Sequence, residues 1–433
     1  MSVLRRVGGI EMAGATIDHL VSVVVFLGAL VLFIGLFNQT IQTAIIYQRH
    51  RYLATKCSDL LDNVLLNPGY PENWGRSNCT PASFGLQDPE FTQYRLSSFS
   101  LMRLLSSAGD RVYYEKIGKW YSNVSWGFGG GYLLLQESEC VNYSTASKLL
   151  GVNGTYGFQL TITPTVNINI VEDIQVTDHL RLNITVMGQG SPLTWVPIEY
   201  FIYWVRFEHE LGFWRNITKA DALGFACLDF DGKSGMPKID VSQNKTAYLF
   251  VARVNLGGLR GVGYLSREIT TKAGNIIPFI ESYEDGIILL AHKWGKNDPG
   301  KECQGALHFN ATFYVLPDNF TPIKSDVLNI TSGPWLVNYG QGKPFYAVQI
   351  PPDALSEVGF LVVTYWREDE DGFEWGMVVM PWGIGTFGLS VVFGGDPSGR
   401  EWVATDMRQV IVNDVAYQAK LLLWSLKGNG VIG

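Results

Sequence analysis

The strongest hydrophobic pattern in the chain is a continuous apolar run near the N-terminus. From Leu20 to Phe37 every residue is apolar, Gly or Ser, and no charged residue occurs between Leu20 and Gln48. About 20 apolar residues suffice to cross a bilayer as a helix, and a buried helix of a soluble domain is normally apolar on one face only. A cleaved secretory signal fits less well, because the run is too long and no small-x-small cleavage site follows it. The run therefore predicts a transmembrane helix over about residues 20–40.

The helical pattern continues beyond the apolar run. Apolar residues recur at steps of three and four, with charged residues between them, which is the spacing of an amphipathic helix. The sequence Asn67-Pro68-Gly69 is a breaker that ends such a helix. We predict one long helix over residues 18–66, whose second half packs its apolar stripe on a globular head, and a cytoplasmic N-terminus or leader over residues 1–17. The apolar positions are Ile41, Ile45, Tyr52, Leu53, Cys57, Leu60, Leu61, Val64 and Leu65.

Beyond the helix the pattern changes to the period of two that is typical of β-strands. Residues 67–157 are loop-rich and form a head region, with a short amphipathic helix expected over 97–107. Strands separated only by turns predict an immunoglobulin-like sandwich over 158–272 and a second β-rich domain over 273–433. The expected fold is therefore mostly β, a long N-terminal transmembrane α-helix followed by antiparallel β-sandwich domains. The predicted strands cover 158–162, 166–170, 180–186, 199–207, 224–230, 248–256, 287–291, 307–316, 345–350, 359–365 and 376–380.

Asn-x-Ser/Thr sequons favour an external location for the β-rich part. Basic residues lie on both sides of the apolar run, so the positive-inside rule does not orient it. Eleven of the 22 Asn residues stand in a sequon, whereas chance would give about two or three. Within Leu180–Val186 the apolar residues point to one side of the strand and Asn183 to the other. Leaving aside Asn38 beside the span, the candidates for N-glycosylation are Asn78, Asn123, Asn142, Asn153, Asn183, Asn216, Asn244, Asn310, Asn319 and Asn329.

Composition narrows the classes of function. Hydrophobic residues make up 47% of the chain and charged residues 17%, which excludes disorder as a description of the whole protein. The net charge is −7, and from Asn67 onward 28 Lys and Arg residues stand against 36 Asp and Glu residues. No basic face for nucleic acid is indicated. The expected partners are the lipid bilayer, through residues 20–40, and like subunits or other envelope proteins.

The cysteines do not form a recognisable metal or redox motif. Five occur, at positions 57, 79, 140, 227 and 303, without a C-x-x-C pair or a His/Cys cluster at metal spacing. Cys57 and Cys79 are a candidate disulfide between the helix and the following loop. Cys227, in the strand-like stretch Gly224–Phe230, is expected to be buried.

Other candidate chemistry is better explained by turns. Gly257–Gly263 is rich in glycine after a strand, but no helix follows to receive a phosphate. Asp229–Ser234 resembles a calcium loop without the required downstream Glu, so a hairpin turn is favoured. Glu368–Asp371 concentrates four carboxylates in a loop, either solvated or weakly binding calcium. The six His residues lack a Ser or Cys partner in a recognisable motif. We predict no enzyme, no metal site and no cofactor.

The sandwich region resembles bacterial immunoglobulin-like and carboxypeptidase-regulatory-like modules of surface proteins. The residues that carry this resemblance are Pro197-Ile-Glu-Tyr-Phe201 and Ile217-Thr-Lys-Ala-Asp-Ala-Leu-Gly-Phe-Ala226. The resemblance covers roughly 90 residues and implies an elaborated strand followed by a turn into the next strand.

A long helix that is apolar in its first half and amphipathic in its second resembles type IV pilins. Together with the segment Asp59–Gly75, it is similar to uncharacterised archaeal membrane proteins with a pilin-like N-terminal helix. If Gly14 preceded a processed N-terminus at Ala15, Asp18 would be the acid that in pilins meets the neighbouring subunit's amine. Processing after Gly9 would instead make Ile10 the first residue of the processed chain and Glu11 the second. Asp18 is therefore the candidate assembly residue, unless it only marks the interfacial end of the span.

These observations favour a structural function. The leading hypothesis is a single-pass, membrane-anchored extracellular surface protein, a structural or pilin-like component of an archaeal cell envelope. The alternative is an adhesin, or an ectodomain that binds a sugar or another solute. Determining the native N-terminus separates the pilin-like role from simple anchoring.

Overall fold

The computed structural model describes residues 4–77, 79–91, 93–106, 111–114, 119–125, 132–136, 141–206, 210–242, 246–267, 276–292, 308–330, 346–369, 372–383 and 387–426. Within these ranges, side chains are not described at 4–16, 106–136, 210, 276–279, 291–292, 308–309, 367–369 and 372–375. The chain divides into two compact units, residues 1–56 and 57–433. As predicted, the fold is mostly β, with one long apolar N-terminal helix followed by several antiparallel sheets.

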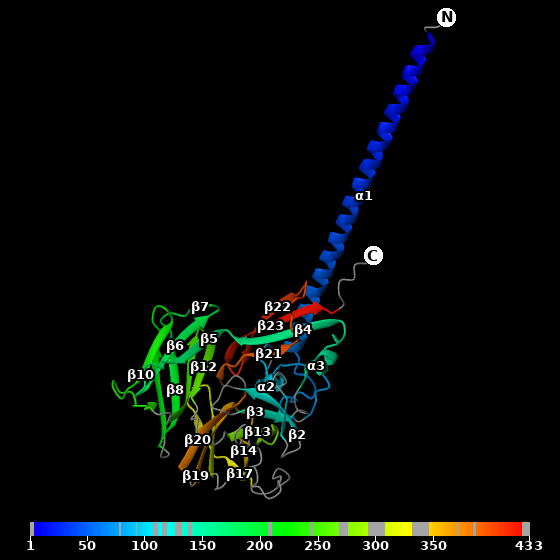
Figure 1. Ribbon diagram of the computed structural model, residues 1–433. Coiled ribbons are helices and arrows are strands. Elements are labelled where there is room, and N and C mark those ends of the chain that lie inside the picture. The colour runs from blue at the N-terminus through cyan, green and yellow to red at the C-terminus, as the bar shows by residue number, and fades with distance from the viewer. Residues whose placement is uncertain are drawn as a thin grey trace. The chain divides into compact units, whose positions relative to one another are not determined.

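The first unit is made by helix α1 (Leu4–Leu65), drawn in blue in Figure 1, which continues into the second unit. Its most apolar 18-residue window has a mean hydropathy of 3.0 and no buried residue, so the helix is long and apolar enough to cross a membrane. The helix begins at Leu4 rather than near residue 18, and it ends one residue before the predicted position. Ile41, Ile45 and Tyr52, which the apolar stripe placed on a packing face, are exposed.

Within its described residues, the second unit contains five sheets and two short helices, α2 (Ser98–Ser106) and α3 (Tyr143–Leu149). Neighbouring strands are antiparallel except β3 and β13. A seven-stranded sheet pairs β1 (Arg111–Tyr114), β2 (Lys119–Ser125), β3 (Tyr132–Gln136), β13 (Ile276–Ser282), β14 (Ile287–His292), β18 (Tyr346–Gln349) and β17 (Leu328–Ile330). A four-stranded sheet pairs β16 (Ile323–Ser325), β15 (His308–Val315), β19 (Gly359–Asp369) and β20 (Gly372–Trp382).

Two sheets form a β-sandwich, drawn in green in Figure 1. One sheet pairs β10 (Phe225–Phe230), β6 (Leu180–Gly188) and β5 (Val166–Glu172), with β7 (Ser191–Pro192) beside β6. The other pairs β12 (Leu259–Arg267), β11 (Thr246–Leu256), β8 (Pro197–Arg206) and β9 (Glu210–Lys219). Alternate residues of β6, Leu180 to Val186, pack with those of β8 and β11 in one core, which is how period-two strands bury one face. The sandwich therefore lies inside the predicted range 158–272.

The fifth sheet crosses the predicted domain boundaries. It pairs β21 (Val391–Gly394), β4 (Tyr156–Pro164), β23 (Val415–Ser425) and β22 (Ala404–Val412). The stretch from Phe158 to Ile162, expected to open the sandwich, is thus held by C-terminal strands, and Leu421 in β23 is buried. The predicted boundaries at 158 and 272 would assign β4 to one domain and its partners β21 and β23 to another. The sheet instead joins these strands, although they lie more than 200 positions apart in the sequence.

The last turns of α1 pack within the second unit. Cys57, Leu60, Leu61, Val64 and Leu65 are buried there, as the apolar spacing predicted. The Cys57 thiol contacts backbone carbonyls of β22 and β23, with Sγ 3.5 Å from the Leu421 oxygen. The helix end therefore packs against the C-terminal strands and not only against the loop-rich region that follows it.

A polar network holds the same helix end on β22. Arg408 donates from Nε to Asp62 Oδ1 over 2.9 Å and from Nη2 to Asp62 Oδ2 over 3.1 Å, and Nη2 also reaches Ser58 Oγ at 3.0 Å. Its Nη1 donates to Asp406 Oδ1 over 2.8 Å. These carboxylates raise the pKa of Arg408. A guanidinium bound in this two-pronged way fixes orientation as well as distance.

Acid is expected to weaken this network through Asp406. Burial opposes ionisation of this carboxyl, but hydrogen bonds from Ser58, Arg408 and the Met407 N–H outweigh it and hold the pKa of Asp406 below its usual range. A depressed folded-state pKa contributes stability above the unfolded pKa, and that stability is lost as the pH falls through the folded pKa. Asp406→Asn should therefore lower the melting temperature at neutral pH, with a difference from wild type that shrinks on acidification.

Thermal unfolding of the full chain in detergent over a pH series measures this effect. Asp353→Asn, in an exposed turn, is the matched control and should leave the profile unchanged. An offset between Asp406→Asn and wild type that is the same at every pH would contradict the assignment.

Candidate functional site

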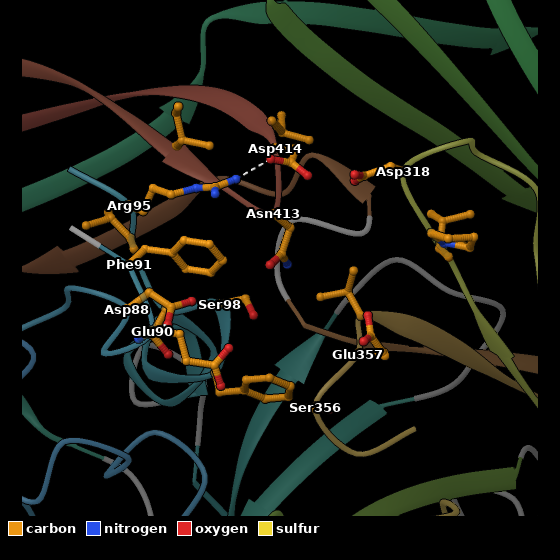
Figure 2. Close-up of a pocket in the computed structure, with 18 of the residues that line it drawn as sticks. Asp88, Glu90, Phe91, Arg95, Ser98, Asp318, Ser356, Glu357, Asn413 and Asp414 are labelled. Carbon is orange, nitrogen blue, oxygen red and sulfur yellow. Dashed lines mark hydrogen bonds and ion pairs between the residues drawn. The ribbon is translucent and has the colours of Figure 1, made fainter. Parts of the chain in front are cut away.

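A cleft of about 750 Å³ lies in the second unit. The residues that line it come from six segments distant in the sequence and lie within positions 72–76, 88–99, 253–262, 316–320, 356–358 and 411–415. Volumes of about 300–1,000 Å³ are typical of ligand pockets. Figure 2 shows Arg95 and Asp414 on one side of the cleft, Asp88, Glu90 and Glu357 on the other, and Asn413 between them.

Arginine and carboxylate groups form one wall. Arg260 Nη1 lies 3.4 Å from Asp318 Oδ1 and 3.4 Å from Asp414 Oδ2, and Arg95 pairs with Asp414, as the dashed line in Figure 2 marks. Arg253 donates to the Asp318 carbonyl and, over 2.7 Å, to Glu199. These contacts join the sandwich, the 316–320 loop and the C-terminal hairpin.

Asp318 and Asp414 affect each other's pKa in opposite directions. A hydrogen bond from Asp414 and the nearby Arg260 lower the pKa of Asp318. Burial and the neighbouring Asp318 raise the pKa of Asp414, against the opposing effect of Arg95 and Arg260. Two carboxyl groups at one site disfavour each other's ionisation, and here the pKa of Asp318 moves down while that of Asp414 moves up.

The turn between β22 and β23 positions Asp414. Val412 pairs with Val415, so Asn413 and Asp414 form a two-residue hairpin loop. Their φ angles are 46° and 62°, which is the type I′ conformation that Asn and Asp tolerate better than other non-glycine residues. The hairpin therefore directs two polar side chains toward the cleft rather than into the sheet.

The opposite wall combines an aromatic floor with carboxylates. The Arg76 guanidinium stacks over Phe99, 4.3 Å from the ring centre, and Nη2 donates to the Ser356 carbonyl over 2.7 Å. Burial lowers the pKa of Arg76, although Glu90 and other carboxylates act against it. Phe91 is 43% exposed, and the Arg95 guanidinium lies 4.2 Å from its ring centre. An exposed ring beside polar groups is a surface on which an apolar face of a ligand can stack.

The cleft can therefore bind a polar molecule through charged, hydroxyl and aromatic groups. Among the described residues, no group of three or more His, Cys, Asp or Glu side chains is arranged to hold a metal ion. The side chains that line the cleft offer hydrogen bonds and a stacking surface to a ligand.

A second polar cluster lies on the outer face of the sandwich. His179 lies 2.8 Å from Asp178 through Nδ1 and 2.5 Å from Asp229 through Nε2, and Arg181 donates to Asp229 over 2.6 Å. Cys227 stands two residues from Asp229 on the same face of β10. Because Arg181 in β6 donates to Asp229 in β10, the cluster holds β6 on β10.

Two predictions about the cysteines are wrong, the Cys57–Cys79 bridge and the burial of Cys227. Cys57 and Cys79 are free thiols, so the candidate bridge does not form; Cys79 instead lies 2.8 Å from Ser77 Oγ. Cys227 is exposed, because Ala226 and Leu228 take the inward positions of β10. Cys140 and Cys303 lie outside the described residues.

The candidate sequons whose side chains are described in the second unit all reach the surface to some extent. Asn183 is half-buried on the polar face of β6, as its pattern predicted, and the others are exposed: Asn142, Asn153, Asn216, Asn310, Asn319 and Asn329. Asn142 also caps α3 by accepting from the Thr145 N–H. Asn78, Asn244 and the side chain of Asn123 lie outside the described residues.

The other predicted features fall at turns or outside the described side chains. Gly257 and Gly258 form the turn between β11 and β12, with positive φ angles of 57° and 87°. Asp231 accepts from the Lys233 N–H in the turn after β10. The side chains of Glu368–Asp371 lie outside the described residues, and Asp18 is exposed on α1.

Sequence reasoning missed the cleft. Its residues come from six segments between positions 72 and 415, and no spacing rule connects them. The local sequence feature among these residues is the pair Asn413-Asp414. This pair is typical of a hairpin turn and does not by itself indicate a binding site. Comparisons with protein-family models and with curated proteins find no match to this chain, so the site rests on its own geometry.

Proposed function

We propose that this chain is a membrane-anchored surface protein that crosses the bilayer once and carries residues 57–433 outside the cell. The observation that carries the proposal is the apolar part of α1, where a window of mean hydropathy 3.0 has no buried residue. A helix that is apolar on all faces and unburied needs a lipid or protein environment. Residues 20–40 are the part we assign to the bilayer.

The external location is supported by the sequons. None of the seven sequon Asn side chains described in the second unit is buried, and surface access is what N-glycosylation requires. Sequons are also more numerous than chance predicts, which supports an external location for residues 57–433.

A structural, pilin-like role in an archaeal envelope is the finer form of the proposal. It draws support from a helix that is apolar in its first part and that, between Cys57 and Leu65, buries its apolar face in a β-rich domain. In this role Asp18 would meet the N-terminal amine of a neighbouring copy. The cleft favours a second candidate function, an adhesin or solute-binding ectodomain, because its volume and polar lining suit a ligand.

Two measurements on the native protein test these proposals. Protease added to intact cells should degrade residues 57–433 but leave the bilayer segment, and survival of the β-rich part would overturn the external location. Mass spectrometry of the N-terminus should find Ala15 or Ile10 if a leader is removed; an intact Met1 or Ser2 would exclude pilin-like processing while leaving the anchor in place.

A further inference from the structure

Asn319 is both a sequon residue and a residue of the cleft. It follows Asp318 in the connection between β15 and β16, and Asn319-Phe320-Thr321 is a complete sequon. Figure 2 shows its neighbour Asp318 at the edge of the cleft. A sugar joined to Asn319 would therefore begin at the cleft wall.

The local structure holds this sequon in place. The Asn319 side-chain oxygen accepts from the Thr321 N–H over 3.0 Å, and its backbone carbonyl accepts from Arg215 Nη2 over 2.9 Å. Phe320 is 1% exposed, with its ring 5.2 Å from that of Phe201. These contacts use the Asn319 oxygens and leave the side-chain nitrogen, the atom that carries an N-glycan, without a hydrogen bond to any described residue.

The cleft lining complements a sugar. Hydroxyl groups both donate and accept, so they can pair with carboxylates such as Asp88 and Glu357 and with arginines on the other wall. The exposed ring of Phe91 offers a stacking surface for the apolar face of a pyranose. A ligand of a single charge would be attracted by some groups of the cleft and repelled by others, because the lining contains both arginines and carboxylates. A polyhydroxyl ligand can form hydrogen bonds with both kinds of group.

We propose that the N-linked glycan of Asn319 occupies this cleft as a ligand built into the chain. The covalent link gives the sugar a high effective concentration at the cleft, so weak individual contacts suffice to hold it. The glycan joins the sandwich to the C-terminal hairpin and the segment 88–99. This inference rests on the external location proposed above.

The test uses full-length protein from its native host. Glycopeptide mass spectrometry should find Asn319 modified, and Asn319→Gln should lower the melting temperature by about 2 °C or more. Asn153→Gln and Asn329→Gln, at exposed sequons outside the cleft, are the matched controls and should have smaller effects. Thr321→Ser preserves the sequon and should retain both the glycan and the wild-type melting temperature.

Two further comparisons separate the glycan from the side chain. In protein made in a bacterial host that adds no N-glycan, Asn319→Gln should lower the melting temperature by less, because only the contact with the Thr321 N–H is lost; an equal loss there would assign the effect to the amide alone and overturn the proposal. With the glycan present, Phe91→Ala and Asn319→Gln should be non-additive, as expected for groups in contact. Strict additivity would place the glycan outside the cleft.

The outcomes also distinguish this inference from the proposed function. Modification of other sequons without Asn319 would overturn the cleft glycan and support the external location. If no sequon is modified, the cleft-glycan proposal fails, and the protease experiment decides the external location.

Discussion

Replacing Arg103 with Met is expected to lower the free energy of unfolding by about 3 kcal/mol or more, because several buried hydrogen bonds to a charged group are lost together. Arg103 stands in α2 and its side chain is fully buried. It donates to the carbonyls of Trp74 and Ser77, the latter at 3.0 Å, and to the Cys79 carbonyl at 2.9 Å. The guanidinium also lies 5.2 Å from the centre of the Trp74 ring.

The physical reason is the structure of the loop around the guanidinium. The described residues of the segment 74–79 belong to no strand, and three of them direct their carbonyl oxygens at Arg103. Methionine has a comparable apolar stem but no donor, so these oxygens would lose a charged partner inside the protein. Leaving a buried acceptor unpaired costs about 1–3 kcal/mol.

Denaturant unfolding of the full chain in detergent measures the loss. Arg206→Met is the matched control, because Arg206 is 45% exposed and pairs with Asp240 over 2.9 Å at the surface. It should cost less than about 1 kcal/mol. Equal losses in the two variants would show that the Arg103 contacts contribute no more than a surface ion pair.

Placing arginines in the apolar part of α1 is expected to have the largest effect on location. Leu27 and Val31 are 51% and 69% exposed and lie one turn apart on the helix. Each arginine costs about 2.5–3.5 kcal/mol at the centre of a membrane helix. The double variant Leu27→Arg, Val31→Arg should therefore fail to integrate and leave the membrane fraction.

Sedimentation of membranes after alkaline extraction measures this effect. The matched control is Gln39→Arg with Gln42→Arg, because arginines near the end of a span reach the interface with their side chains. That pair should remain in the membrane pellet. If Leu27→Arg, Val31→Arg also remains there, residues 20–40 are not the anchor.

Patterns within single elements gave the most accurate predictions. The breaker Asn67-Pro68-Gly69 predicted the end of α1, which is at Leu65. Leu180 to Val186 showed which face of β6 is buried, because side chains alternate along a strand. Cys227 shows the limit of hydrophobicity alone: the residue is apolar enough for a core, but its position in the strand points outward.

The sequence by itself determined the apolar helix, because an uninterrupted run of apolar residues predicts a membrane-spanning helix whatever the rest of the chain forms. Local periodicity predicted strands such as β5, β6 and β11 in the same way, but it did not predict β9 or β12. Only the tertiary structure decided that β4 joins β23, that the end of α1 meets Arg408, and that six segments enclose a cleft. Such contacts depend on which strands pair over long separations, and many pairings satisfy the same local pattern. The sequence identified Asn319 as a sequon, but the fold put it at a cleft.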